Sequence, residues 1–349
     1  MTIQELIDRF IAFQIDLSRL FNGSVFDVLK ELNKHDPDLL ARLTDILDDL
    51  EGRYSEARLN AAIKQFIEVN SEAFAAAKES LNRQVENTAL ATSKWLEVTY
   101  ALGADVVAAN SGQVMAGIRS RPFQGILLKE ALKVIEANRA ESIRRAIRMG
   151  FAEGKTTQEI VRAIKGTKAT NYADGLLNRS RKDIQTMVRT ALSHTARASM
   201  DQFYSENSDI IGGLMWLSTL DNRTSSLCVV RSGLKYTNEE MPKPIGHKVP
   251  WLSGPGRLHF NCRSVSLALL KEQEKLFGTR SSMDGYVGAN TTYGDWLKRQ
   301  PESVVADVLG PTRANLFKAG KIPLDKFFTD TGQLMTLSQF YTKHGIKPD

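Results

Sequence analysis

Cysteine is scarce in this chain, with Cys228 and Cys262 the only two among 349 residues. Two thiols cannot form a framework of disulfides, which excludes the small disulfide-stapled class of secreted protein and indicates folding in a reducing compartment. Long apolar runs are missing as well, because no segment approaches the roughly 18 apolar residues of a membrane-spanning helix. The N-terminal stretch mixes Glu5, Asp8 and Arg9 into its apolar residues and so differs from a signal peptide. We expect folding in a cytoplasm, with no membrane partner.

Dense runs of lysine and arginine are also absent, although the formal net charge is +6 and the isoelectric point is near 9.2. Such a balance permits contact with nucleic acid without requiring it. The basic excess falls on the middle of the chain. Five residues there are candidates for contact with DNA phosphates, independent of base sequence: Arg144, Arg145, Arg148, Lys155 and Arg162. The alternative is a solvated helical face without a partner.

The residues that are present predict an α+β fold that is mostly α. An apolar fraction of 42% and a charged fraction of 25% are those of a folded soluble protein, and 349 residues predict two or three domains. Apolar residues recur at three- and four-residue steps as far as about residue 103, which predicts a helical N-terminal arm or bundle over residues 1–115. Asp36 followed by Pro37 predicts the start of a helix. The apolar stripes either form the core of this bundle or dock on a partner helix.

Residues 116–175 are predicted to form a helical connector. Thr156 and Glu159 have the spacing of a capping box, and Gly166 supplies the stop of the same helix. Two helices across a glycine-containing turn occur in DNA-reading helix-turn-helix proteins and also in simple helical hairpins. We favour the simple packing unit, because the sequence shows nothing that resembles a dimeric recognition helix.

Residues 176–270 are predicted to form a small α+β domain. A helix over residues 180–204 is followed by extended segments at 210–220 and 264–269, both rich in β-forming residues. The polar connection between them is rich in proline and glycine, and a loop so long is usually functional or pinned by something. Trp216 and Trp251 bracket this connection and are expected to anchor the core. Residues 271–349 are predicted to be a C-terminal extension of short helical or hairpin pieces.

The second half of the chain carries several motifs in a fixed order. A helix contains Val188, Arg189 and Thr190, the stretch WLSTLDNRTSSLC covers residues 216–228, and HFNCRS covers residues 259–264. In this order and spacing the chain resembles the phage Mu F-like head morphogenesis proteins, also called minor head or minor capsid proteins. The residues that carry the resemblance are Arg189, Asp221, Arg223, Thr224, Cys228, His259, Cys262 and Arg263. The first half of the chain carries no matching motif.

The resemblance implies a virion structural protein rather than an enzyme, with a Mu F-like domain at residues 176–270. It implies assembly in the host cytoplasm and a place in the phage head near the portal vertex. The implied partners are the portal protein, other head proteins and phage DNA bound without sequence preference. The implied role is head morphogenesis, with assistance to DNA packaging or ejection.

The resemblance also bears on zinc. In many relatives the turn contains Cys-x-x-Cys, which completes a tetrahedral site with the later histidine and cysteine, whereas this chain has Ser225 in place of the first thiolate. Cys228, His259 and Cys262 remain, and His247 in the long connection is the candidate fourth ligand, since structural zinc normally takes four. A zinc-dependent DNA-binding module is one alternative.

We favour a structural role without a cofactor. In that hypothesis Asp221 pairs with Arg223, His259 donates a ring proton to a carbonyl, and the two cysteines act as small buried hydrophobes. In this hypothesis the motif holds in place the long polar connection that joins the two predicted strands.

Two enzyme hypotheses compete with this structural one. Mu F-like domains are distantly similar in fold to ADP-ribosyltransferases, and Arg189 with Ser218–Thr219 match two site elements of those enzymes. The next position is Leu220, and the later strand offers no carboxylate to polarise a nucleophile. A nucleophile pair of Cys262 with His259 lacks an orienting group nearby in the sequence. We expect no catalysis, and an ADP-ribosyltransferase-like enzyme or effector stays as the alternative.

Overall fold

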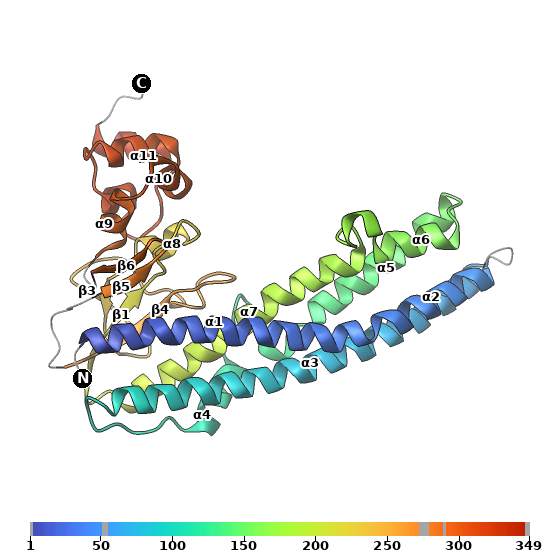
Figure 1. Cartoon of the computed structure of the whole chain (residues 1–349), viewed down its shortest axis with the longest axis horizontal. Helices are drawn as coiled ribbons and strands as arrows, with labels where there is room; N and C mark the ends of the chain where they lie inside the picture. The colour runs from blue at the N-terminus through green and yellow to red at the C-terminus, as the bar shows by residue number, and fades with distance from the viewer. Residues whose placement is uncertain (1–2, 51–54, 272–278, 289–290, 346–349) are drawn as a thin grey trace. The chain divides into compact units, whose positions relative to one another are not determined.

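The computed structural model describes residues 3–50, 55–271, 279–288 and 291–345 (Figure 1). The chain is α+β and mostly α, as the sequence predicts. It forms two compact units, each assembled from separated stretches of the chain. Unit 1 comprises residues 1–17, 91–114 and 196–349, and unit 2 comprises residues 18–90 and 115–195. The boundaries of the four consecutive segments proposed from the sequence stay a prediction.

Long helices dominate the described chain. Three of them contribute residues to both units: α1 (Ile3–Lys34), α3 (Glu56–Tyr100) and α7 (Leu176–Glu206). The short helix α4 (Ser111–Ser120) also does so. Unit 2 further contains α2 (Asp36–Leu50), α5 (Lys133–Ala152), α6 (Thr157–Lys165) and the 3-10 turns η1 (Leu128–Glu130) and η2 (Lys168–Thr170). Within the described residues, no helix is both long enough and apolar enough to cross a membrane.

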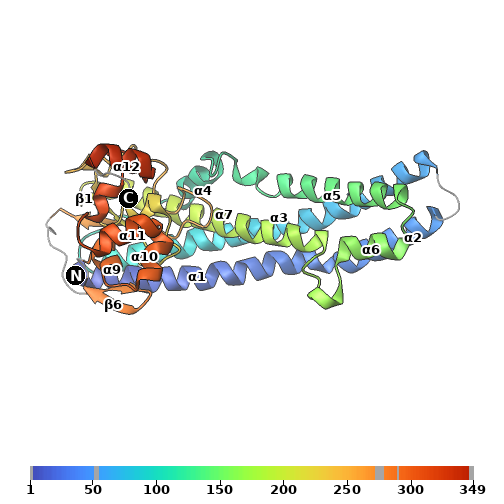
Figure 2. The same ribbon diagram turned by 90° about the horizontal axis from the view of Figure 1, so that it is seen from above.

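The core of unit 2 is built from apolar stripes, and its helices run alongside one another in both views (Figures 1 and 2). Leu39, Leu43 and Leu47 of α2 are buried at four-residue steps, which places them on one face of the helix. The remaining buried members come from α3, α5, α6 and α7: Leu59, Ile63, Phe66, Val69, Ile143, Ile147, Ile160, Ile164 and Leu177. The stripe of α2 therefore belongs to the chain's own core.

The helix start and stop signals lie where the sequence places them. α2 begins at Asp36, directly before Pro37. At the start of α6, the Thr156 Oγ1 accepts a hydrogen bond from the Glu159 N–H at 3.3 Å, and the Glu159 carboxylate accepts one from the Thr156 N–H at 2.9 Å. Gly166 ends α6 with a φ of 95°, a value that a residue with a Cβ rarely adopts. The predicted capping box and stop are confirmed.

Unit 1 contains a four-stranded antiparallel sheet with the order β3-β2-β1-β4. Its strands are β1 (Ile211–Leu217), β2 (Lys235–Tyr236), β3 (Pro244–Ile245) and β4 (Val265–Leu270). The two strands predicted from the sequence, β1 and β4, pair with each other from Leu217 opposite Val265 to Ile211 opposite Leu270. Because the pair is antiparallel, the residues that follow β1 lie next to those that precede β4. The two ends of the long connection therefore meet.

Two tyrosines cover the outer edge of β4. The Tyr100 hydroxyl donates to the Ala268 carbonyl at 3.0 Å and accepts from the Ala268 N–H at 3.1 Å. The Tyr204 hydroxyl donates to the Ser266 carbonyl at 3.0 Å. These bonds occupy backbone groups that an exposed edge strand would offer to another chain.

The C-terminal part of unit 1 consists of short pieces, as expected from the sequence. They are the hairpin of β5 (Thr279–Ser282) and β6 (Gly285–Gly288), then α9 (Tyr293–Lys298), α10 (Glu302–Leu309), α11 (Pro311–Lys318), the 3-10 turn η3 (Leu324–Phe327) and α12 (Leu337–His344). Leu220 and Val229, which follow β1, share a core with Tyr293, Trp296 and Phe317 of these helices. The extension therefore packs on the segment that carries the motifs.

Candidate functional site

Two cysteines and a histidine meet where β1 ends and β4 begins. Cys228 lies on α8 (Ser226–Val229), a single helical turn after β1, whereas His259 and Cys262 lie in the turn before β4. The Sγ atoms of the two cysteines are 3.7 Å apart, and Cys228 Sγ is 3.4 Å from His259 Nε2. Only 2% of Cys228 and 4% of Cys262 is exposed. The three ligand atoms lie within 4.8 Å of one another and can hold a metal ion, so we name these residues the Cys–His cluster.

Hydrogen bonds orient the His259 ring within the cluster. Its Nδ1 is 2.9 Å from the carbonyl oxygen of Phe260, which only accepts, so in the neutral ring Nδ1 carries the proton and Nε2 presents its lone pair. The Ser225 Oγ lies 2.8 Å from Nε2 and donates to it in that tautomer. The same Oγ caps α8 by accepting from the Cys228 N–H at 3.4 Å. Ser225 thus stands beside the three ligand atoms.

The pKa values of the two thiols are shifted in opposite directions. A hydrogen bond from Cys228 lowers the pKa of Cys262, with His259 acting in the same direction and burial opposing it. The same hydrogen bond raises the pKa of Cys228, and burial adds to the increase. A hydrogen bond with Cys262 also raises the pKa of His259, against the effect of burial. Cys262 is therefore the sulfur that loses its proton first, and the thiolate is the form that binds metals.

Asp221 organises the adjacent turn. Its carboxylate accepts two hydrogen bonds from the Arg263 guanidinium, at 2.6 and 2.8 Å, and one from the Thr224 Oγ1 at 3.0 Å. The Tyr293 hydroxyl donates to the Asp221 carbonyl at 2.6 Å. Burial raises the pKa of Asp221, but the hydrogen bonds and charge of Arg263, the hydrogen bond from Thr224 and the charge of Arg223 together outweigh it, so the pKa lies below its ordinary value. Arg223, the partner proposed from the sequence, also pairs with Asp221, but its side chain is 80% exposed and its Nε lies 3.8 Å away, so Arg263 is the closer partner.

Two buried arginines fix the backbone around the cluster. Arg231 is fully buried and donates to the carbonyls of Pro250 at 3.0 Å and Leu227 at 2.7 Å. Arg280 is 6% exposed and donates to the Ser218 carbonyl at 2.6 Å, and burial lowers the pKa of Arg280 to about 10. Sequence reasoning missed both residues, because a buried arginine in a polar stretch produces no periodic signal. Through these hydrogen bonds the two arginines hold the backbone of the long connection, and the end of β1 before it, in place.

His247 is not part of the Cys–His cluster. Its Nε2 donates to the Lys235 carbonyl at 2.8 Å, and its Nδ1 accepts from the Val249 N–H at 3.2 Å. Since both ring nitrogens are engaged by backbone groups, the prediction of His247 as a fourth ligand is wrong. The structure brings together the other three candidates.

The residues of the ADP-ribosyltransferase hypothesis are engaged in structural contacts. The Ser218 Oγ is buried, donates to the Cys228 carbonyl at 2.7 Å and accepts from the Ser264 Oγ at 3.3 Å. Arg189 belongs to unit 2, where its guanidinium donates to the Asn22 side chain at 3.1 Å. Ser218 belongs to unit 1. The Ser218 hydroxyl is buried and makes two hydrogen bonds within the protein, so it is poorly placed to contact a substrate.

The candidate DNA contacts lie on α5, on α6 and in the turn between them. Arg145, Arg148, Lys155 and Arg162 are exposed, and Arg144 is half-buried. Glu141 pairs with Arg144 at 2.7 Å and Glu153 pairs with Lys155 at 2.5 Å, while Arg148 donates to Asn60 at 3.1 Å. Intrahelical and neighbouring acids thus offset part of the basic charge.

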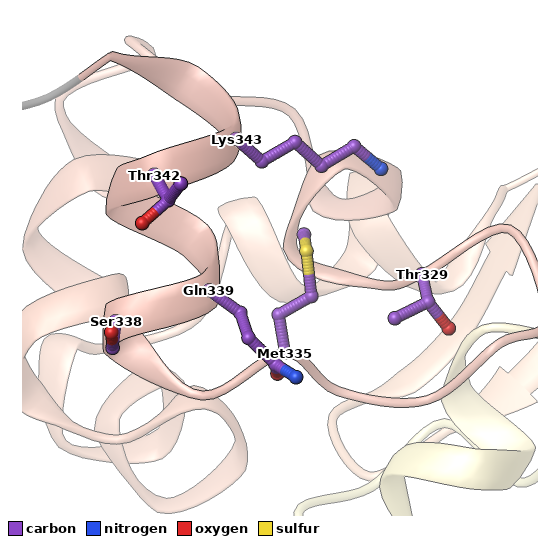
Figure 3. Close-up of a pocket in the computed structure, with 6 residues that line it drawn as sticks. All are labelled: Thr329, Met335, Ser338, Gln339, Thr342 and Lys343. Carbon is purple, nitrogen blue, oxygen red and sulfur yellow. The ribbon is translucent and has the colours of Figure 1, made fainter.

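Two surface hollows lie apart from the cluster. One of about 410 Å³ is lined by Thr329, Met335, Ser338, Gln339, Thr342 and Lys343 (Figure 3). Its lining residues are of polar type apart from Met335, but the surface that they present to the hollow is mostly apolar. Lys343 pairs with Asp330 at 3.8 Å. Another of about 200 Å³ in unit 2 includes three lysines that sequence reasoning missed: Lys78, Lys129 and Lys133. Neither lining pairs a nucleophile with a base.

Comparison with known proteins reveals no relative: no family model, no curated protein and no solved structure matches this chain. The function is therefore inferred from the motifs and from the geometry of the Cys–His cluster.

Proposed function

We propose that this chain is a structural protein of a phage head, of the Mu F-like minor head class, that acts in head morphogenesis. The observation that supports it best is the convergence of the motif residues at one corner of unit 1. Asp221 and Arg263 are 42 positions apart yet form a bidentate pair, and the Cys–His cluster lies in the same two segments. These motif residues contact mainly one another and backbone groups, which suits residues that hold two segments of the chain together.

The proposed place of the protein is near the portal vertex, with the portal protein and other head proteins as partners. The test is co-expression with a phage portal protein, followed by affinity capture and sedimentation of assembled heads. The expected result is capture of the portal protein at a fixed ratio and presence of the chain in purified particles. The proposal is refuted if the chain is folded and soluble but captures no portal protein and is missing from particles.

Contact with packaged DNA is a separate part of the proposal and depends on exposed basic residues of α5 and α6. Replacing Arg145, Arg148 and Arg162 with glutamine removes three exposed charges. The matched control removes three exposed charges elsewhere, at Arg83, Lys94 and Lys343. The expected result is that only the first variant loses DNA affinity and reduces its salt dependence, because each phosphate contact releases counterions. Equal behaviour of the two variants assigns any binding to net charge alone.

A second proposal concerns metal: the Cys–His cluster takes a zinc ion through Cys228, His259 and Cys262. Zinc bonds of about 2.3 Å to sulfur and about 2.0 Å to nitrogen in a tetrahedron separate two sulfurs by about 3.8 Å and a sulfur from a nitrogen by about 3.5 Å. The observed separations are 3.7 and 3.4 Å. The carbonyl of Phe260 fixes Nε2 as the nitrogen that faces the sulfurs. Bound zinc would supply a structural cross-link between α8 and the turn before β4.

The zinc proposal is tested at the position beside the three ligands. In Ser225→Cys a thiolate replaces the hydroxyl that lies 2.8 Å from His259 Nε2. We expect wild-type protein to bind about one zinc that a chelator removes, and the variant to hold it at least tenfold more tightly, because structural zinc prefers four strong ligands. Ser226→Cys adds a thiol one position away as the control. Less than about half an equivalent of zinc in wild type, with no gain in Ser225→Cys over the control, refutes the proposal.

The enzyme alternative makes an opposite prediction. An ADP-ribosyltransferase-like protein transfers label from labelled NAD to itself or to a target protein. We expect no transfer, since Ser218 is buried and bonded to backbone. Label incorporation that Ser218→Ala abolishes would replace the structural proposal with an enzymatic one.

A further inference from the structure

The two cysteines of the chain lie next to each other as free thiols. Their proposed structural role, as small buried hydrophobic residues, does not require two adjacent sulfurs. Their Sγ atoms are 3.7 Å apart, whereas a disulfide needs about 2.05 Å, so an adjustment of less than two ångströms joins them. The chain contains no third cysteine to compete. Cys228 sits on α8, and Cys262 sits in the turn that precedes β4.

Access to the pair lies through that turn. Cys262 is buried, but its neighbours Asn261 and Arg263 are exposed, and Phe260 is 47% exposed. Asn261 has a φ of 55°, a left-handed conformation that marks a tight surface turn. Cys262 is therefore flanked on both sides by exposed residues, and we expect hydrogen peroxide to reach it more readily than a bulky oxidant.

We infer that Cys228 and Cys262 are a peroxide-sensitive pair that forms an intramolecular disulfide and so locks the long connection covalently. The Cys262 thiolate attacks one oxygen of hydrogen peroxide, the O–O bond breaks, and the sulfenic acid and one water form after proton uptake. Cys228, whose Sγ lies 3.4 Å from His259 Nε2, passes its proton to that nitrogen and attacks the Cys262 sulfur as a thiolate. The S–O bond breaks, and the leaving hydroxide takes up the proton from His259 as a second water. In sum, two thiols and one peroxide give one disulfide and two waters.

The disulfide and a bound metal exclude each other, because both need the same two sulfurs. The inference does not depend on the virion role or on zinc, since it uses the metal-free thiols alone. It adds a covalent state in which α8 is tied to the end of the long connection. A cross-link of this span restricts the unfolded chain and is expected to raise the thermal unfolding midpoint.

The test treats full-length, chelator-stripped protein with increasing hydrogen peroxide, alkylates the remaining thiols and measures the intact mass and the linked peptides. We expect both thiols to be lost together, a peptide pair joined through Cys228 and Cys262, recovery of both thiols with dithiothreitol, and a higher unfolding midpoint in the oxidised form. Loss of one thiol alone, disulfide-linked dimers, or two thiols that stay free at peroxide concentrations that oxidise exposed cysteine would each overturn the inference.

Two variants test the order of steps. In Cys228→Ser the sulfenic acid on Cys262 has no thiol partner, so a dimedone adduct is expected at Cys262, whereas wild type gives the disulfide and no adduct. Cys262→Ser is the matched variant: Cys228 is expected to keep its thiol at the peroxide concentration that oxidises wild type. A dimedone adduct at Cys228 in this variant that forms as readily as the one at Cys262 overturns the order of steps. Should Cys228→Ser not fold, the wild-type peptide linkage still decides.

Discussion

The two units are stabilised in different ways. In unit 2, leucine and isoleucine side chains at helical spacing form the core, and its caps join residues three positions apart. In unit 1, buried polar and charged groups hold segments far apart in the sequence: Tyr100 bonds to Ala268, and Arg280 bonds to the Ser218 carbonyl. A helical unit can be held together by apolar residues at regular helical spacing. A unit with a long connection also needs polar contacts, because the backbone groups of the loop require hydrogen-bond partners.

The largest expected effect tests a buried carboxylate in unit 2. Asp36 is buried and accepts hydrogen bonds from Arg139, at 2.8 Å, and from Arg181. Asp36→Ala leaves two guanidinium groups without their acid, so we expect a loss of about 3–5 kcal/mol in the free energy of unfolding. Urea denaturation followed by circular dichroism measures it.

The control for this change is Asp38→Ala. Asp38 is exposed and pairs with Arg42 at 3.6 Å, so its loss should cost less than about 1 kcal/mol. Equal effects of the two variants would mean that unit 2 depends on its apolar stripes alone.

A smaller effect is expected at the organising acid of unit 1. Asp221→Asn removes the bidentate pair with Arg263, whose side chain is 40% exposed and stays hydrated, so we expect a loss of about 2–3 kcal/mol. Asp307→Asn is the control, because Asp307 makes one exposed contact of 3.3 Å to Asn222. A loss at Asp221 no greater than at Asp307 contradicts the role assigned to it.

The same residue predicts a pH dependence. The pKa of Asp221 lies below its ordinary value in the folded chain, so its contribution is complete above the unfolded value of about 3.9 and is lost as the pH falls through the lower folded value. Stability measured between pH 6 and about 3 should therefore fall more steeply in wild type than in Asp221→Asn. Parallel curves would show that other carboxylates account for the acid sensitivity.

The smallest effect is expected at the cap of α6. Thr156→Ala removes the side-chain acceptor for the Glu159 N–H, and we expect a loss of about 1 kcal/mol. Amide hydrogen exchange at the first turn of α6 should accelerate in this variant and not in Gln158→Ala, which changes an exposed neighbour. Unchanged exchange at Glu159 would remove the capping box from the account of unit 2.

Much of the fold could be predicted, because its signals are local. The capping box at Thr156, the start of α2 at Asp36 and the two strands β1 and β4 all follow from residue type and spacing. The meeting of Cys228 with His259 and Cys262 was expected from the resemblance alone. The role of His247 was predicted wrongly, since sequence distance gives no information on which carbonyl a ring nitrogen meets.

The sequence by itself determined the helical stripes, the cap positions, the scarcity of thiols and the absence of a thiolate at Ser225. The tertiary structure alone decided that Arg263 rather than Arg223 is the main partner of Asp221, that Arg231 and Arg280 hold the connection, and that the two sulfurs stand 3.7 Å apart. The physical reason is the antiparallel pairing of β1 with β4, which brings the two ends of a long polar loop to one corner. Periodicity predicts which face of a helix is buried, but contacts across a loop depend on where the chain returns.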